Sequence, residues 1–121
     1  MTTMTTDRKQ IVNQVNDAFA ANNVEGFLAL CVNDVEWTMV GDTTVKGKDA
    51  IRKWMGSMNM EPPKFTVTDV IADGDFAMAH GDMKMDENGQ QAVPYAYCDI
   101  YHFRGNEIDQ LRSFVIKTAG K

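Results

Sequence analysis

The segment that most constrains this chain is Val93–Phe103, VPYAYCDIYHF, in which the residues alternate as they do in a long β-strand. Successive side chains of a strand point to opposite faces of its sheet. One face would carry Tyr95, Tyr97, Asp99, Tyr101 and Phe103, and the other Ala96, Cys98, Ile100 and His102. Because both sets are mostly apolar, we expect a strand that is covered on both sides.

Asp99 is the one acid in this segment, and it lies among aromatic residues. A carboxylate on a covered face is costly unless it is hydrogen-bonded or protonated. We therefore interpret Asp99 as a candidate functional acid whose pKa is raised by desolvation beside Tyr97, Trp37 and methionine side chains. The alternative is a structural acid that reaches solvent at the strand edge or pairs with a neighbouring Arg or Lys.

Length and charge limit the classes of partner. A chain of 121 residues fits a single domain, residues 1–121, with a core large enough to contain a pocket. The net charge of -5 disfavours nucleic acid or an anionic membrane as the main partner. No apolar stretch could span a membrane, and the opening residues 1–6 resemble no signal peptide, so we expect a cytoplasmic protein with a disordered start.

Helical and extended patterns alternate in the first half of the chain. After Asp7, a candidate helix cap, apolar residues three and four positions apart predict a first helix, namely Ile11, Val15, Ala18 and Phe19. The segments expected next are a short helix over Val24–Val32, a strand over Asp34–Val40, an extended Thr43–Lys46 and a third helix over Ala50–Met58.

The second half of the chain reads as four strands joined by turns. They are Phe65–Ala72, Phe76–Met85, Val93–Phe103 and Ile108–Thr118. Three helices followed by a long antiparallel sheet predict an α+β fold.

Three segments in this order resemble the nuclear transport factor 2-like superfamily, in its SnoaL-like and ketosteroid isomerase-like branch. They are NNVEGFLALCVNDVEW, VKGKDAIRKWM and CDIYHFRGNEIDQLRSFV. The resemblance covers nearly the whole chain and implies a cystatin-like roll, a cone-shaped curved mixed or antiparallel sheet wrapped around three N-terminal helices. This fold hosts isomerases, cyclases, hydrolases, dehydratases and proteins without catalysis, so it implies no single function.

Carried over residue by residue, the resemblance matches Asp99 to the acid that donates a hydrogen bond to the oxyanion in ketosteroid isomerases. The general base of those enzymes falls on or beside Thr38, and their oxyanion tyrosine near Val15. Threonine is no base at neutral pH and valine has no donor, so we do not expect steroid isomerase activity. The arginine between two acids that epoxide-hydrolase relatives use is also missing.

Two more residues are candidate catalytic partners of Asp99. The resemblance places the strand face of His80 toward the cavity, where His80 and Asp99 could hold a proton between them. Tyr97 shares the face of Asp99 and could donate a phenolic hydrogen bond. The alternatives are that His80 is a satisfied core histidine or points outward at the rim, and that Tyr97 is a packing residue.

Large side chains elsewhere could line a pocket for a small apolar or aromatic ligand, or could simply form the core. The candidate ligand-binding residues are Trp37, Thr38, Trp54, Met55, Met58, Met78 and Leu111. We expect no metal, because the chain has no HxH, HExxH or CxxC spacing, and no cofactor, because it has no glycine-rich phosphate loop.

Two classes of function remain open. One is an isomerase, cyclase or lyase without cofactor, in which Asp99 acts on a hydrophobic carbonyl-type substrate. The alternative is a non-catalytic module of the same fold that binds a ligand or a protein.

The strand face opposite Asp99 predicts a homodimer. It would carry Ala96, Cys98, Ile100 and His102 beside Arg112, Phe114 and Ile116 of the next strand, and three helices suffice for one face only. A second copy is the simplest cover, and the resemblance agrees, because many relatives pair through this face. The alternative is a monomer whose sheet curls over this face or which awaits a different partner.

Overall fold

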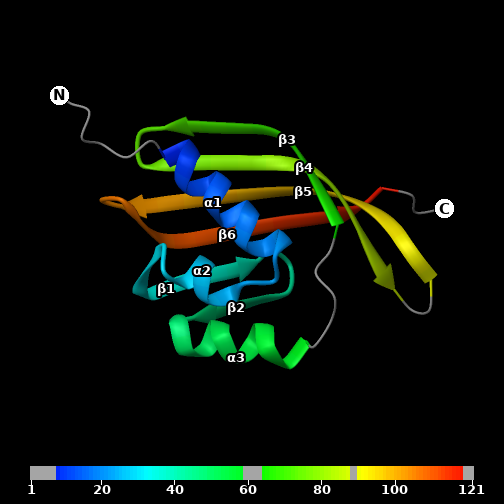
Figure 1. Cartoon of the computed structure of the whole chain (residues 1–121), viewed down its shortest axis with the longest axis horizontal. Helices are drawn as coiled ribbons and strands as arrows, with labels where there is room; N and C mark the ends of the chain where they lie inside the picture. Colours follow the sequence, from blue (N-terminus) through cyan, green and yellow to red (C-terminus); the bar gives the residue numbers. More distant parts are fainter. Residues whose placement is uncertain (1–7, 59–63, 88–89, 119–121) are drawn as a thin grey trace.

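A computed structural model of the protein describes residues 8–58, 64–87 and 90–118 (Figure 1). In chain order the elements are α1 (Arg8–Ala20), α2 (Val24–Leu28), β1 (Cys31–Met39), β2 (Thr43–Lys46), α3 (Lys48–Met58), β3 (Lys64–Asp73), β4 (Phe76–Glu87), β5 (Gln90–Arg104) and β6 (Glu107–Lys117). The expected cap at Asp7 and the expected disorder of residues 1–6 lie outside the described residues.

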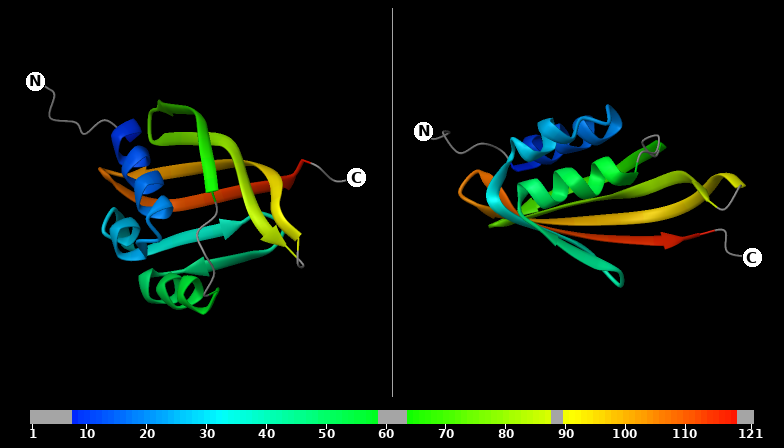
Figure 2. Two further views of the ribbon diagram at one scale, coloured as in Figure 1. Left: turned by 45° about the vertical axis from the view of Figure 1, so that its right-hand side comes forward. Right: turned by 90° about the horizontal axis from the view of Figure 1, so that it is seen from below.

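The strands form one six-stranded sheet in the order β2-β1-β6-β5-β4-β3. Neighbours from β3 to β6 pair antiparallel, whereas β1 pairs parallel with β6 and antiparallel with β2. The helices lie on one face of this curved sheet (Figure 2). We call the face toward the helices the inner face and the opposite one the outer face. The α+β cone expected from the sequence is confirmed.

The core lies between the helices and the inner face. Its largest fully buried side chains are Tyr101 and Phe103 of β5, Phe27 and Leu28 of α2, and Ile51 of α3. Burying side chains of this size contributes roughly 2 kcal/mol each, which is what holds the amphipathic helices against the sheet. None of the helices in the described ranges is long and apolar enough to cross a membrane.

Arg8 fixes the start of α1 against two turns of the sheet. Its guanidinium donates to the backbone carbonyls of Gly74, between β3 and β4, and Gly105, between β5 and β6. It also lies 5.1 Å from the centroid of the Phe103 ring, so one cation connects the helix, both turns and the core.

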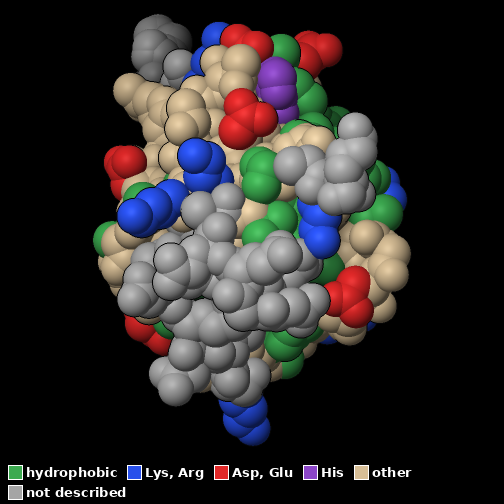
Figure 3. Space-filling model, turned by 90° about the vertical axis from the view of Figure 1, so that its right-hand side faces the viewer, with side chains coloured by type: hydrophobic (Ala, Val, Ile, Leu, Met, Phe, Trp, Pro, Cys, Tyr) green, Lys and Arg blue, Asp and Glu red, His purple; other side chains and the backbone are tan. Residues whose placement is uncertain are grey.

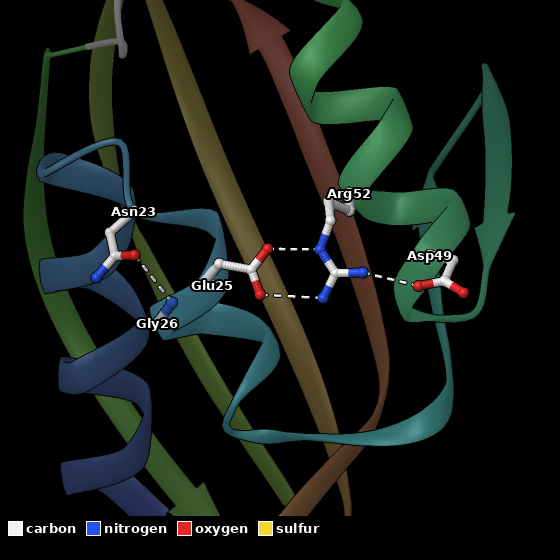
Figure 4. Close-up of polar contacts among 5 residues, drawn as sticks. All are labelled: Asn23, Glu25, Gly26, Asp49 and Arg52. Carbon is white, nitrogen blue, oxygen red and sulfur yellow. Dashed lines mark hydrogen bonds and ion pairs between the residues drawn. The ribbon is translucent and has the colours of Figure 1, made fainter.

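A polar cluster sets the positions of α2 and α3 relative to each other (Figure 4). The side chain of Asn23 accepts a hydrogen bond from the N–H of Gly26 at 3.0 Å and so caps α2. Glu25, in the first turn of α2, accepts two hydrogen bonds from Arg52 of α3, which also binds Asp49 at 2.7 Å. Arg52 lowers the pKa of Glu25 by this hydrogen bonding. Because the cluster is exposed, it orients the helices more than it stabilises them.

The predicted helix over Val24–Val32 is too long. The helix α2 ends at Leu28, and Cys31 and Val32 already belong to β1, which starts before the predicted Asp34. The cause is tertiary: the N–H of Ile108 in β6 donates to the carbonyl of Leu30, and Cys31 pairs with Ile108. Parallel pairing with β6 therefore overrides the local helical pattern.

Gly81 marks a close approach of β4 and β3, next to an irregularity in their pairing between Val67 and Asp69. A Cβ atom at Gly81 would lie 1.9 Å from the carbonyl oxygen of Thr66. We expect Gly81→Ala to lower the free energy of unfolding by more than about 4 kcal/mol, because backbone must move to admit the methyl group. Urea denaturation measures this change.

Gly56 supplies the matched control, because it lies exposed in α3 with no atom within 4 Å of an added Cβ. We expect Gly56→Ala to stabilise the protein by roughly 0.5–1 kcal/mol, since alanine loses less backbone entropy in a helix. Equal effects of the two substitutions would contradict the close approach at Gly81.

Candidate functional site

Asp99 lies on the inner face near the middle of β5. Its cross-strand neighbours are Ala79 of β4 and Ser113 of β6, and its side chain is 9% exposed. The five residues of β5 expected on this face are all buried: Tyr95, Tyr97, Asp99, Tyr101 and Phe103. The alternation predicted for this strand is therefore present, and the acid lies under the helices, not at a solvent-exposed edge.

A chain of hydrogen bonds connects Asp99 to the indole of Trp37. The Nε1–H of Trp37 donates to Oγ of Ser113 at 2.9 Å, and the side chain of Ser113 is hydrogen-bonded to the carboxyl group of Asp99. Trp37 and Ser113 are themselves 8% and 4% exposed. The three groups come from three adjacent strands, so the sheet itself holds the chain in place.

The environment of Asp99 shifts its acidity. Burial disfavours the charged form and raises the pKa of Asp99 from 3.8 to about 6, while the hydrogen bond from Ser113 opposes part of this rise. The direction and the main cause agree with the expectation from the sequence. A carboxyl group with a pKa near neutrality can both release and take up a proton under physiological conditions.

Three buried donors near this face have no hydrogen-bond partner among the described residues. They are the hydroxyls of Tyr97 and Tyr101 and the amide nitrogen of Asn16 on α1. Burial raises the pKa of Tyr97 to about 12, so its hydroxyl stays protonated. Residues two apart on a strand are about 7 Å apart, so the two tyrosines flank Asp99 in a row. Buried donors of this kind normally have a hydrogen-bond partner in the protein, in ordered water or in a ligand.

An aromatic wall lies beside this row. The ring of Trp37 stacks on that of Phe19 of α1, with 5.5 Å between the ring centroids. It meets the rings of Phe27 of α2 and Trp54 of α3 edge-on, with centroid distances of 5.4 and 5.2 Å. Met55 packs against the same core. Three of the candidate ligand-binding residues, Trp37, Trp54 and Met55, are thus on the helix side of the sheet, as expected.

The predicted pair of His80 with Asp99 is wrong. Strand β4 aligns Ala79, not His80, with Asp99, and His80 is the partner of Cys98 on the outer face. There Nε2 of His80 lies 3.1 Å from Oδ2 of Asp69, which makes the alternative of an outward-pointing histidine correct. Directly paired residues of an antiparallel ladder share a face. The residues of β4 that face the helices are therefore Ala77, Ala79 and Gly81, and not the alternate set that contains His80.

The same alignment corrects further candidates. Met78 pairs with Ile100 on the outer face, and Thr38 pairs with Arg112 there, its hydroxyl lying 3.0 Å from that of Thr44. Neither side chain faces the helices. Leu111 is fully buried in the core, and the side chain of Met58 lies outside the described residues.

Ser113, Tyr101 and Asn16 were not predicted as site residues. Ser113 had a usable signal, because it is a polar residue two positions after Leu111 and therefore shares the face of that core residue. Asn16 had none, since it adjoins the apolar stripe of α1 at a position that could equally face solvent. In the described part of the chain, no group of three His, Cys, Asp or Glu side chains could hold a metal ion.

Comparison with known proteins places the chain in a family. The family model described as a SnoaL-like domain matches residues 12–111. The chain belongs to the SnoaL-like family. No curated protein matches the sequence of this SnoaL-like protein.

Solved structures share the fold of this SnoaL-like protein. An NTF2-like protein of unknown function from Cytophaga hutchinsonii is 21% identical with a TM-score of 0.76, over 91% of this chain and 100% of that one. TerC, co-crystallised with polyporic acid, is 14% identical with a TM-score of 0.76, over 88% and 90%. An LEH-like epoxide hydrolase from M. tuberculosis is 15% identical with a TM-score of 0.76, over 89% and 81%. At these identities the likeness concerns the fold alone.

The raised pKa of Asp99 predicts how stability depends on pH. The folded state holds the proton more tightly than the unfolded chain, so this group stabilises the fold fully below about pH 4 and loses that contribution as pH rises through about 6. Asp99→Asn removes the charge. We expect the variant and the parent to have similar free energies of unfolding at pH 4, and the variant to be more stable by up to about 3 kcal/mol at pH 8.

Urea titrations across this range measure the difference. Asp42→Asn, in the exposed turn between β1 and β2, is the control for replacing a carboxylate in contact with water. Parallel pH profiles for the parent and Asp99→Asn would show that Asp99 keeps an ordinary acidity.

Proposed function

We propose that the inner face binds a small hydrophobic ligand with a carbonyl-type oxygen, and that Asp99 donates a hydrogen bond or a proton to that oxygen. The protein would then act as an isomerase, cyclase or lyase without a cofactor. The observation that carries this proposal is a buried acid with a pKa near 6, flanked by tyrosine hydroxyls that lack partners in the described structure.

Asp99 can act in either protonation state, because its pKa is close to neutrality. When protonated it donates to the ligand oxygen, and when ionised it can take a proton from one position of a bound ketone and return it to another, which is the core step of an isomerisation. The tyrosine hydroxyls, which stay protonated, can hold the oxygen on which negative charge develops. The aromatic wall of Trp37 and Trp54 suits a flat, apolar ligand body.

Steroid isomerase activity stays outside the proposal. Val15 is fully buried and offers no donor, and Thr38 faces away from Asp99, so neither replaces the missing isomerase residues. Two relatives of the fold support a small-molecule role in general, since one was co-crystallised with polyporic acid and another is an epoxide hydrolase-like enzyme. The second candidate, a binding module without chemistry, uses the same inner face.

Binding of acetonaphthone, a flat ketone, tests the proposal. Binding is measured by quenching of the fluorescence of Trp37 and Trp54, the only tryptophans of the chain. Because only protonated Asp99 donates to the ketone, we expect affinity at about pH 5 to exceed that at about pH 8 by roughly tenfold or more. Ethylnaphthalene, which lacks the oxygen, should bind without pH dependence.

Asp99→Asn is the matched variant. Its amide donates a hydrogen bond at every pH, so ketone binding should persist and lose its pH dependence. A parent protein that binds no ketone at both pH values would contradict the proposal. Exchange of the α-protons of the ketone in deuterated water separates the two functions: an enzyme exchanges them and Asp99→Asn slows this about 100-fold or more, whereas a binding module does not.

We also propose that the outer face joins two copies of the chain. Cross-strand pairing puts Phe114 beside Cys98 and Ile116 beside Ala96 on this face, and no described helix covers it (Figure 2). Ile71, Phe76 and Ile116 are 51%, 52% and 65% exposed. So much apolar surface is unusual on a monomer. The end of the molecule at the right of Figure 1 carries Lys, Arg, Asp and Glu side chains beside hydrophobic ones where it is described (Figure 3).

Analytical ultracentrifugation checks the dimer. We expect a species of twice 13.5 kDa at micromolar concentration, and we expect Ile116→Glu to shift it to the monomer because the charge would be buried in the interface. Val40→Glu, at an exposed apolar residue in the turn after β1, should leave the dimer intact. A parent protein that sediments as a monomer would refute this proposal.

A further inference from the structure

The hydrogen bonds that end at Asp99 have a fixed direction. An indole N–H can donate a hydrogen bond but cannot accept one. Since Trp37 donates to Oγ of Ser113, the remaining proton of the Ser113 hydroxyl is free to point toward Asp99. The carboxyl oxygen that faces Ser113 therefore accepts this proton when Asp99 is ionised.

We propose that Trp37 and Ser113 are positioning residues that fix which oxygen of Asp99 carries its exchangeable proton. In this proposal the Ser113 hydroxyl keeps donating to the oxygen that faces it when Asp99 is protonated, so the proton of Asp99 resides on the other oxygen. For ligand chemistry this assignment rests on the proposed function, because it says which oxygen would meet the ligand. The chain of hydrogen bonds from Trp37 through Ser113 to Asp99, which we call the relay, does not depend on any ligand.

The geometry favours a direct relay. Asp99 and Ser113 are paired residues on β5 and β6, and Trp37 follows on β1, the next strand of the sheet. Residues that are directly opposite on neighbouring strands have side chains close enough to contact each other. All three residues are buried, so water competes little for these hydrogen bonds, and each bond polarises the next.

Two tyrosines and one cysteine near Asp99 stay neutral over the relevant pH range, because burial raises the pKa values of Tyr97, Tyr101 and Cys31. Asp82 pairs with Ala96 on the outer face. Lys117 lies farther along β6, opposite Tyr95. The histidines lie elsewhere: His80 pairs with Cys98 and His102 with Phe76, both on the outer face.

Nuclear magnetic resonance of the ligand-free protein tests the relay. We expect the indole Nε1–H resonance of Trp37 to move with pH, with the same midpoint as the carboxyl carbon of Asp99, about 6. In Asp99→Asn the resonance should become independent of pH, which excludes other titrating groups as the source. Trp54→Phe identifies the Trp37 signal and should leave the pKa of Asp99 unchanged.

Substitutions at Ser113 separate positioning from simple packing. Ser113→Ala removes the donor, so the pKa of Asp99 should rise above that of the parent and the Trp37 resonance should stop following it. Ser113→Thr keeps the hydroxyl and should restore both properties. A Trp37 resonance that stays fixed while Asp99 titrates, or an Asp99 pKa that is the same in Ser113→Ala, would overturn the proposal.

These outcomes are distinct from a failure of the proposed function. A protein that binds no ketone can still show the coupled titration, in which case the relay is real and the ligand assignment is wrong. A protein that binds the ketone with the expected pH dependence but shows no coupling retains the function and loses the relay.

Discussion

The pairing of β5 between β4 and β6 determines the character of both faces of this protein. In each ladder, directly opposed residues share a face, so one register decides that Asp99 meets Ala79 and Ser113 and that Cys98 meets His80 and Phe114. The helices then cover the first set and leave the second uncovered. A slip of one residue would put the acid in water and the apolar set under the helices.

The inner face concentrates the polar groups that a globular core would normally avoid. A carboxyl group, two tyrosine hydroxyls and a serine lie among residues that are almost completely buried. The cost of desolvating the carboxyl appears as a raised pKa, and the hydrogen bond from Ser113 recovers part of it. A core under selection for stability alone would hold apolar side chains at these positions, which is why we interpret the row as a site.

Membership of the SnoaL-like family does not decide the chemistry. Proteins with this fold and less than 25% identity to the chain include an epoxide hydrolase-like enzyme and a protein of unknown function. On the described inner face, the cross-strand neighbours of Asp99 are Ala79 and Ser113, neither of which is a base. His80, the candidate partner that could have shared a proton with Asp99, is bound to Asp69 on the other side of the sheet. The chemistry available to a single acid is proton donation and return, which limits the reactions to be considered.

Much of the fold follows from the sequence alone. The alternation in Val93–Phe103 determined the strand and the face of Asp99, and the helical spacing after Asp7 determined the amphipathic α1, because both patterns arise from local backbone geometry. Tertiary structure decided what depends on alignment between strands. The early end of α2 follows from pairing with β6, and the facing of His80, Met78 and Thr38 follows from register, which a single strand does not encode. The relay through Ser113 needed three strands side by side, so only the assembled sheet could show it.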